Sequence, residues 1–234
     1  MEEKEPLAAR LRPKTLDDFV GQDHLVGPGN PSTGLRAGPL RVAVEKGHRF
    51  SFILWGPPGS GKTTLARIYA RSLGAELFEL SAVSAGKDDI RQIVAFKTNK
   101  PKILFLDEIH RFNKAQQDFL LPSVESGELT LIGATTENPS FEVISALLSR
   151  CRVFVLDELG SADMAKILKR TGLKIPKEAG EWLVRMANGD ARQALTVLEA
   201  AERLYGKVTV ETLTEALQSK FLRYDKKGEE HYNV

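Results

Sequence analysis

Segments with strand and helix patterns alternate along the first two thirds of the chain. Short apolar or alternating runs predict strands at 50–55, 76–80, 102–106, 130–134 and 152–156. Apolar residues that recur every three or four positions predict helices at 39–46, 62–73, 88–97 and 114–125, although Pro122 should bend or end the last of these. Strands that alternate with helices favour an α/β fold, a parallel sheet with helices on both faces.

The last third has a different pattern. From residue 161 onward the sequence predicts four helices and shows no strand signal. Asp190 and Thr209 stand at expected N-caps, and Gly206 follows the expected end of one helix. A small all-α domain should therefore follow the sheet.

Composition adds few constraints. The chain has 234 residues and a formal net charge of +2, which neither demands nor excludes a nucleic-acid partner. Its one cysteine, Cys151, excludes an internal disulfide and fits a reducing compartment. The N-terminus is charged rather than signal-like, and no apolar run has membrane-spanning length, so we expect a cytoplasmic protein with no membrane partner.

The sequence GPPGSGKT follows the first predicted strand and opens a helix. This is the pattern of a phosphate-binding loop, in which glycines turn backbone N–H groups toward phosphate oxygens. Lys62 should reach the β- and γ-phosphates of ATP, and the Thr63 hydroxyl should bind Mg²⁺. The expected nucleotide contacts are Gly56, Pro57, Pro58, Gly59, Ser60, Gly61, Lys62, Thr63 and Thr64.

Asp107 and Glu108 come directly after another apolar strand. In parallel sheets ligands bind at the carboxyl ends of strands, so this pair should face the phosphate loop. Asp107 would hold Mg²⁺, and Glu108 would act as general base toward the attacking water. The second carboxylate indicates hydrolysis rather than nucleotide storage.

Three further residues are candidates for catalysis. Thr136, after the next strand, can bond the lytic water or the γ-phosphate, but it can equally cap its own loop. Arg150 and Arg192 fit both a cationic group that completes phosphoryl transfer and ordinary surface ion pairs, and their spacing does not decide between the two.

Other polar residues suggest structural roles. His110 has no partner at metal-ligand spacing and is expected to shape the loop after the acidic pair. Cys151 is expected to be buried at the start of a strand. We interpret Lys97, Lys100 and Lys102 as a solvated face, with contact to a phosphate backbone as the alternative.

With these motifs placed, the chain resembles the AAA+ ATPases of the clamp-loader clade, and within it the replication-associated recombination protein A family. The resemblance rests on ARLRPKTLDDFVGQDHLVG, WGPPGSGKTTLA, FLDEIHRFNKAQQDFLLPSVESG, LIGATTENPSFEV, LLSRC and GDARQAL. It implies an ATP- and Mg²⁺-dependent, nucleoid-associated bacterial protein.

The resemblance also implies residue roles. Thr136 matches the first sensor, Arg150 the arginine finger offered to a neighbouring subunit, and Arg192 the second sensor on the lid. The adenine pocket would be lined by Arg12, Pro13, Val20, Gly21 and Gln22.

Further implications concern partners and boundaries. Such proteins bind DNA at forks, gaps and single-strand/double-strand junctions, associate with single-stranded DNA-binding protein, and form homo-oligomers through a helical C-terminal domain. The expected division is an N-terminal segment at 1–47, an ATPase core at 48–158, a helical lid at 159–220, and the start of a truncated region at 221–234.

Three functions fit these observations. The first is a DNA-dependent ATPase of replication-fork maintenance, recombination and repair. The second is an ATP-switched loader or scaffold resembling a clamp-loader subunit. The third is a small-molecule kinase, which the Asp107–Glu108 pair and the helical lid disfavour.

Overall fold

The computed structural model describes residues 5–29, 32 and 36–218. The predicted region at 221–234 lies outside them. Two compact units are present: one spans Pro13–Glu158, and the other joins the first helix to the segment that begins at Leu159. The predicted N-terminal segment at 1–47 contributes residues to both units, and the chain passes from one unit to the other between residues 158 and 159. The functional division into core and lid stays a prediction.

The first unit is a five-stranded parallel sheet in the order β2-β3-β4-β1-β5. All five predicted strands are present, with boundaries within two residues of expectation. Their bounds are β1 (Phe52–Trp55), β2 (Glu76–Ser81), β3 (Lys102–Asp107), β4 (Leu129–Thr135) and β5 (Arg152–Val155).

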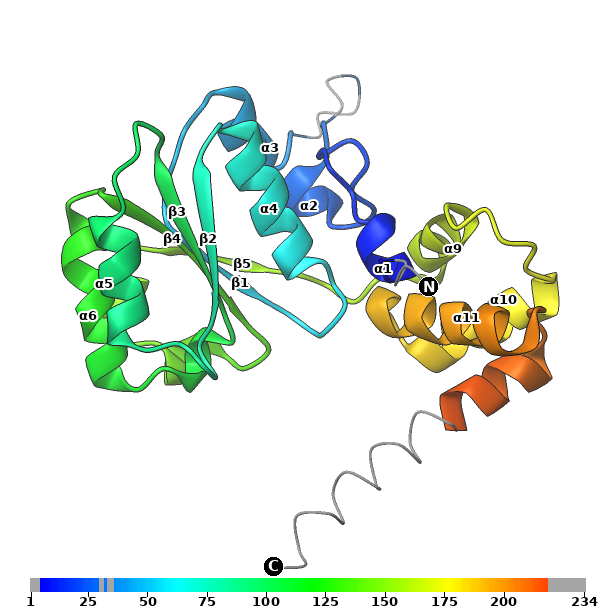
Figure 1. Cartoon of the computed structure of the whole chain (residues 1–234). Helices are drawn as coiled ribbons and strands as arrows, with labels where there is room; N and C mark the ends of the chain where they lie inside the picture. Colours follow the sequence, from blue (N-terminus) through cyan, green and yellow to red (C-terminus); the bar gives the residue numbers. More distant parts are fainter. Residues whose placement is uncertain (1–4, 30–31, 33–35, 219–234) are drawn as a thin grey trace, which may run out of the picture. The chain divides into compact units, whose positions relative to one another are not determined.

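Helices cover both faces of this sheet, as predicted (Figure 1). One face packs against α3 (Pro39–Glu45) and α4 (Lys62–Ser72) through a core around Phe52, Leu54 and Phe105. The other packs against α5 (Lys87–Ala95), α6 (Lys114–Glu125) and α8 (Ser145–Leu148). The shorter elements of this unit are α2 (Asp23–Val26), the 3₁₀ turn η2 (Ile109–Arg111) and α7 (Pro139–Glu142).

Pro122 lies inside α6 and does not end it. Asn113 starts this helix by accepting a hydrogen bond from the Gln116 N–H, and the Gln116 side-chain oxygen accepts one from the Asn113 N–H. Leu120 is fully buried, and the Pro122 carbonyl still accepts a hydrogen bond from the Ser126 N–H. Packing and these remaining hydrogen bonds therefore outweigh the helix hydrogen bond that the proline cannot donate.

The second unit is helical, as predicted. Its elements are α1 (Leu7–Arg10), α9 (Ser161–Lys169), α10 (Lys177–Ala187), α11 (Ala191–Tyr205) and a helix at 210–218. Asp190 caps α11 by accepting from the Gln193 N–H, and Thr209 does the same for the Thr212 N–H. Their apolar sides form a separate core around Leu183, Leu198 and Leu213. Within the described part of the chain, no helix has the length and hydrophobicity to cross a membrane.

Candidate nucleotide site

The loop between β1 and α4 adopts a conformation that requires glycine. Gly59 and Gly61 have φ of 73° and 103°, where side chains with a Cβ are strained. A Cβ on Gly56 would stand 2.4 Å from the Leu156 carbonyl oxygen. The Ser60 hydroxyl donates to the Pro57 carbonyl at 2.8 Å and braces the loop from within. Glycine at these positions therefore lets the loop adopt this conformation, and the Ser60 hydrogen bond holds it together.

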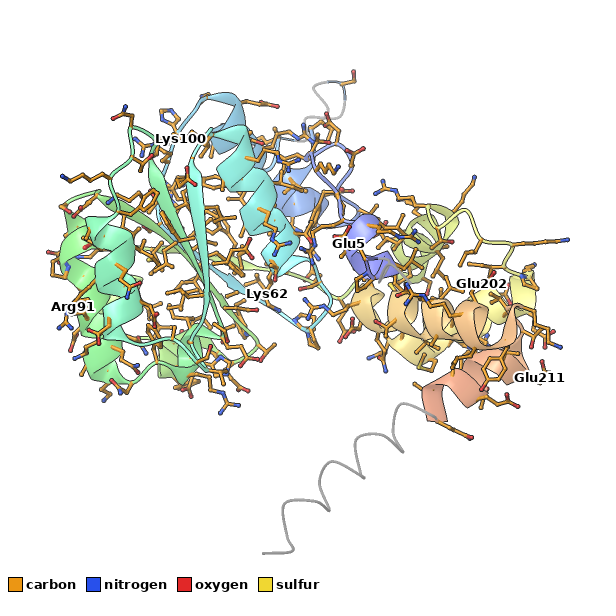
Figure 2. All side chains as sticks on the ribbon, viewed as in Figure 1. Glu5, Lys62, Arg91, Lys100, Glu202 and Glu211 are labelled. Atoms are coloured by element: carbon orange, nitrogen blue, oxygen red, sulfur yellow. The ribbon has the colours of Figure 1, made fainter. Side chains whose placement is uncertain are left out.

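Lys62 begins α4 beside this loop (Figure 2). Its Nζ donates to the carbonyls of Gly56 at 2.7 Å and Pro57 at 2.8 Å, so the ammonium group is held over the loop. The first turn of an α-helix has N–H groups without intrahelical partners and carries partial positive charge. Lys62, Thr63 and Thr64 occupy that turn, so the loop, the ammonium and the helix start suit a chain of phosphates.

The strand register brings the acidic pair to the same edge of the sheet. Trp55 pairs with Thr135 across β1 and β4, and Leu106 pairs with Gly133 across β3 and β4. Asp107 and Glu108 therefore lie at the same carboxyl edge as the phosphate loop, with β4 between β3 and β1. Neither carboxylate has a cation within ion-pair distance in the described residues, and this oxygen set suits Mg²⁺.

Glu108 has a backbone conformation that is rare for its residue type. Its φ is 53°, in the left-handed region, and its N–H donates to Asp107 Oδ1 at 3.1 Å. Such a conformation costs about 1–3 kcal/mol and persists where the surroundings enforce it, often at functional sites. Here the conformation turns the chain away from β3, with Asp107 half-buried and Glu108 exposed.

Thr135 and His110 form a contact that the sequence analysis did not single out. His110 Nδ1 and Thr135 Oγ1 lie 3.0 Å apart, and Thr135 is buried. The Thr135 hydroxyl also accepts from the Glu137 N–H at 2.9 Å. His110 thus shapes the loop after the acidic pair, as expected, and ties η2 to the end of β4. Thr136 is the exposed residue directly after β4, and its sensor role stays a prediction.

The residues expected to line the adenine pocket differ in their contacts. Phe19 packs its ring against Gly61, so the N-terminal segment covers part of the phosphate loop. Gln22 is buried with φ of 59°, and its side-chain amide donates to the Asp157 carbonyl at 2.7 Å and accepts from the Asp157 N–H at 3.0 Å. Gln22 therefore fixes the backbone just after β5.

The rest of that predicted pocket is divided between the units. Pro13, Val20 and Gly21 belong to the sheet unit and Arg12 to the helical unit. The adenine pocket stays a prediction.

The two candidate arginines lie on different units. Arg150 follows α8, donates to the Ala146 carbonyl and pairs with Glu125. Arg192 is exposed near the start of α11. Arg150 is thus the surface ion-pair partner that the local sequence allowed, and a role for it in another subunit stays a prediction.

Two minor expectations need revision. Lys102 is not on a solvated face: its side chain is 11% exposed, and its Nζ donates to the Val94 carbonyl at 2.5 Å and lies 3.5 Å from Glu128. Cys151 is half-buried rather than buried. Burial raises the pKa of its thiol to about 12, so it stays protonated at neutral pH.

Comparison with protein families gives two matches along the chain. Residues 52–159 match the ATPase family associated with various cellular activities (AAA), and residues 169–234 match the AAA C-terminal domain. The chain belongs to the AAA family of ATPases.

Relatives of this AAA chain include two bacterial proteins named replication-associated recombination protein A. It is 47% identical to that of Coxiella burnetii, over 97% of this chain and 54% of the relative. It is 42% identical to that of Escherichia coli, over 98% and 55%. The ATPase WRNIP1 of Dictyostelium discoideum is 39% identical, over 98% and 30%. The chain thus spans about half the length of the bacterial relatives.

A solved structure supports the fold. The Thermotoga maritima RuvB Holliday junction branch migration motor matches with a TM-score of 0.70 and 28% identity, over 89% of this chain and 72% of that one. The AAA chain therefore combines a P-loop parallel sheet with a helical unit, as predicted.

Proposed function

We propose that this chain is the ATP-hydrolysing part of a DNA-dependent ATPase of replication-fork maintenance, recombination and repair. The observation that carries the proposal is the shared carboxyl edge: β1 leads into the phosphate loop, and β3 leads into two carboxylates that have no ion-pair partner among the described residues. The names of the relatives, which refer to replication and recombination, support the biological setting.

Within this proposal each residue has a defined part. The loop N–H groups and the Lys62 ammonium bind the phosphates, and the Thr63 hydroxyl and Asp107 hold the metal. Mg²⁺, when bound, neutralises charge on the phosphate oxygens. Glu108 accepts a proton from the attacking water. Thr136 senses the γ-phosphate, and Arg192 contacts the nucleotide.

Arg150 would act across an interface. An arginine supplied by a neighbour is a recurrent means of stabilising the charge of phosphoryl transfer. On this proposal the protein works as a homo-oligomer in which Arg150 leaves Glu125 and reaches the neighbouring subunit's ATP. The proposed partners are DNA junctions, gaps or forks and single-stranded DNA-binding protein, in the bacterial cytoplasm at the nucleoid.

The test is the ATPase rate per subunit against protein concentration, with and without gapped DNA. We expect the rate to rise with both. A rate unchanged by DNA at every concentration would contradict the proposal. The alternative of an ATP-switched loader is favoured by the SRC sequence at 149–151, and it predicts that stimulation by DNA also needs a sliding clamp.

A further inference from the structure

Phe141 is an apolar side chain held in water. It is 84% exposed, the largest exposed fraction among the large hydrophobic residues that the structure describes. It lies in α7, whose start is fixed because the Asn138 side chain accepts from the Ser140 N–H and Pro139 is buried. Phe141 is therefore an exposed aromatic ring whose backbone is held in place by the turn around it.

Gln117 joins this turn to the end of η2. The Gln117 side chain is 1% exposed, and its Nε2 donates to the carbonyls of Phe112 and Glu142, each at 2.9 Å. Its Oε1 accepts from the Ile144 N–H at 2.9 Å. The buried Gln117 amide therefore holds the backbones of Phe112 and Glu142 close together. These residues directly follow Arg111 and Phe141.

Two cations lie on the η2 side of this amide. Arg111 ends η2 and Lys114 begins α6; both are exposed, and neither has a described acidic side chain within ion-pair distance. Glu137 and Glu142 are also exposed near Phe141, so the surface is not uniformly basic. We refer to Phe141, Arg111 and Lys114 as the aromatic–cationic surface.

The turn η2 connects this surface to the proposed general base. The Arg111 N–H donates to the Glu108 carbonyl at 2.8 Å, and His110 bonds Thr135 at the end of β4. Ile109, between them, is fully buried beside Gly133. A ligand on Arg111 is thus three residues from Glu108, through a turn with little freedom to move independently.

From these observations we infer that the aromatic–cationic surface binds single-stranded nucleic acid, with a base stacked on Phe141 and phosphates on Arg111 and Lys114. The faces of bases are open for stacking only where they are unpaired, and stacking tolerates any sequence. The exposed acids limit the phosphate contacts to these two cations. This inference rests on the proposed function and extends it, because a strand bound here acts through η2 on Glu108.

The test is binding of fluorescein-labelled oligothymidylate to the 234-residue chain, measured by anisotropy. We expect Phe141→Ala and Phe141→Leu each to weaken binding about 5- to 100-fold, and Phe141→Trp to keep it. Arg111→Ala should lower the slope of log affinity against log salt by about 0.7. Phe96→Leu and Lys97→Ala are matched controls at the opposite edge of the sheet, and both should bind as the unchanged protein does.

Several results would overturn the inference. Unchanged binding by Phe141→Ala excludes the surface, and wild-type-like binding by Phe141→Leu excludes stacking of a base on an aromatic ring. Absent binding by the unchanged chain also overturns it. If DNA stimulates ATP hydrolysis equally in the unchanged chain, Phe141→Ala and Arg111→Ala, this inference fails while the proposed function stands. If DNA stimulates none of them, the proposed DNA dependence fails.

Discussion

The charged residues at the two edges of the sheet differ in whether they have partners within the fold. At the amino edge, Lys100 lies 3.7 Å from Glu76, the largely buried Lys102 lies 3.5 Å from Glu128, and the Arg152 guanidinium stacks over the Phe50 ring at 4.9 Å. Figure 2 shows Lys100 and Lys62 at opposite edges. These three cations of the amino edge thus have partners within the fold.

Several charged residues at the carboxyl edge have no such partners. Asp107, Glu108, Arg111 and Lys114 have no ion pairs among the described residues, and Glu108 also has a strained backbone. Charges that neutralise each other contribute to stability, whereas uncompensated charges and local strain cluster at functional sites. We therefore expect substitutions at the amino edge to change the stability of the fold, and substitutions at the carboxyl edge to change ATP hydrolysis.

Arg150 is the expected exception, because it lies before β5 and yet is proposed to act in catalysis. Arg150→Ala should lower kcat about 1000-fold, since it removes positive charge from the transition state in the neighbouring site. Glu125→Gln, which removes only its ion-pair partner, should not lower kcat. Steady-state ATP hydrolysis at a concentration where the rate has reached its plateau measures both.

Mixing two inactive variants tests whether Arg150 acts between subunits. In a mixed oligomer, an Arg150→Ala subunit keeps its own Glu108 and can receive the intact Arg150 of a Glu108→Gln neighbour. Such a site has both residues. The mixture should therefore recover activity that neither variant has alone. Absence of recovery over a range of mixing ratios would contradict action across an interface.

Substitution of Lys102 tests whether the partnered charges of the amino edge stabilise the fold. Lys102→Ala should lower the free energy of unfolding by about 1–3 kcal/mol, because it leaves the Val94 carbonyl and Glu128 without their partner. Lys100→Ala is the matched control and should stay within about 0.5 kcal/mol, since its pair is exposed. Urea denaturation gives the stabilities. Equal stability of the two variants would show that the buried lysine contributes nothing.

The raised pKa of Cys151 predicts a smaller effect on the free energy of unfolding, which appears at alkaline pH. Its folded-state pKa is raised to about 12 from 9.0, so its contribution to stability is complete below pH 9 and is lost as pH rises toward 12. The loss should be about 1 kcal/mol per pH unit. Burial also raises the pKa of Tyr69, so the difference between the unchanged protein and Cys151→Ala isolates the thiol. Parallel stability curves for the two proteins above pH 9 would contradict this account.

Much of the fold and of the site followed from local patterns. The five strands, the phosphate loop, the acidic pair and the caps at Asp190 and Thr209 depend on residues close in sequence. The Gln22 and Gln117 contacts did not, because each amide bonds backbone groups that no side-chain pattern marks, in one case 135 residues away. Lys102 was misplaced for the same reason: its burial depends on the Val94 carbonyl and Glu128, which only the folded chain brings to it.

The most direct test of the central claim is ATP hydrolysis by Glu108→Gln in a single turnover, with MgATP affinity measured on the same sample. The account predicts that hydrolysis falls at least about 100-fold, because the general base is lost, while affinity stays within about 2-fold. A hydrolysis rate equal to that of the unchanged protein, or a loss that disappears at saturating ATP, would contradict the assignment of Glu108 and with it the hydrolytic role of the carboxyl edge.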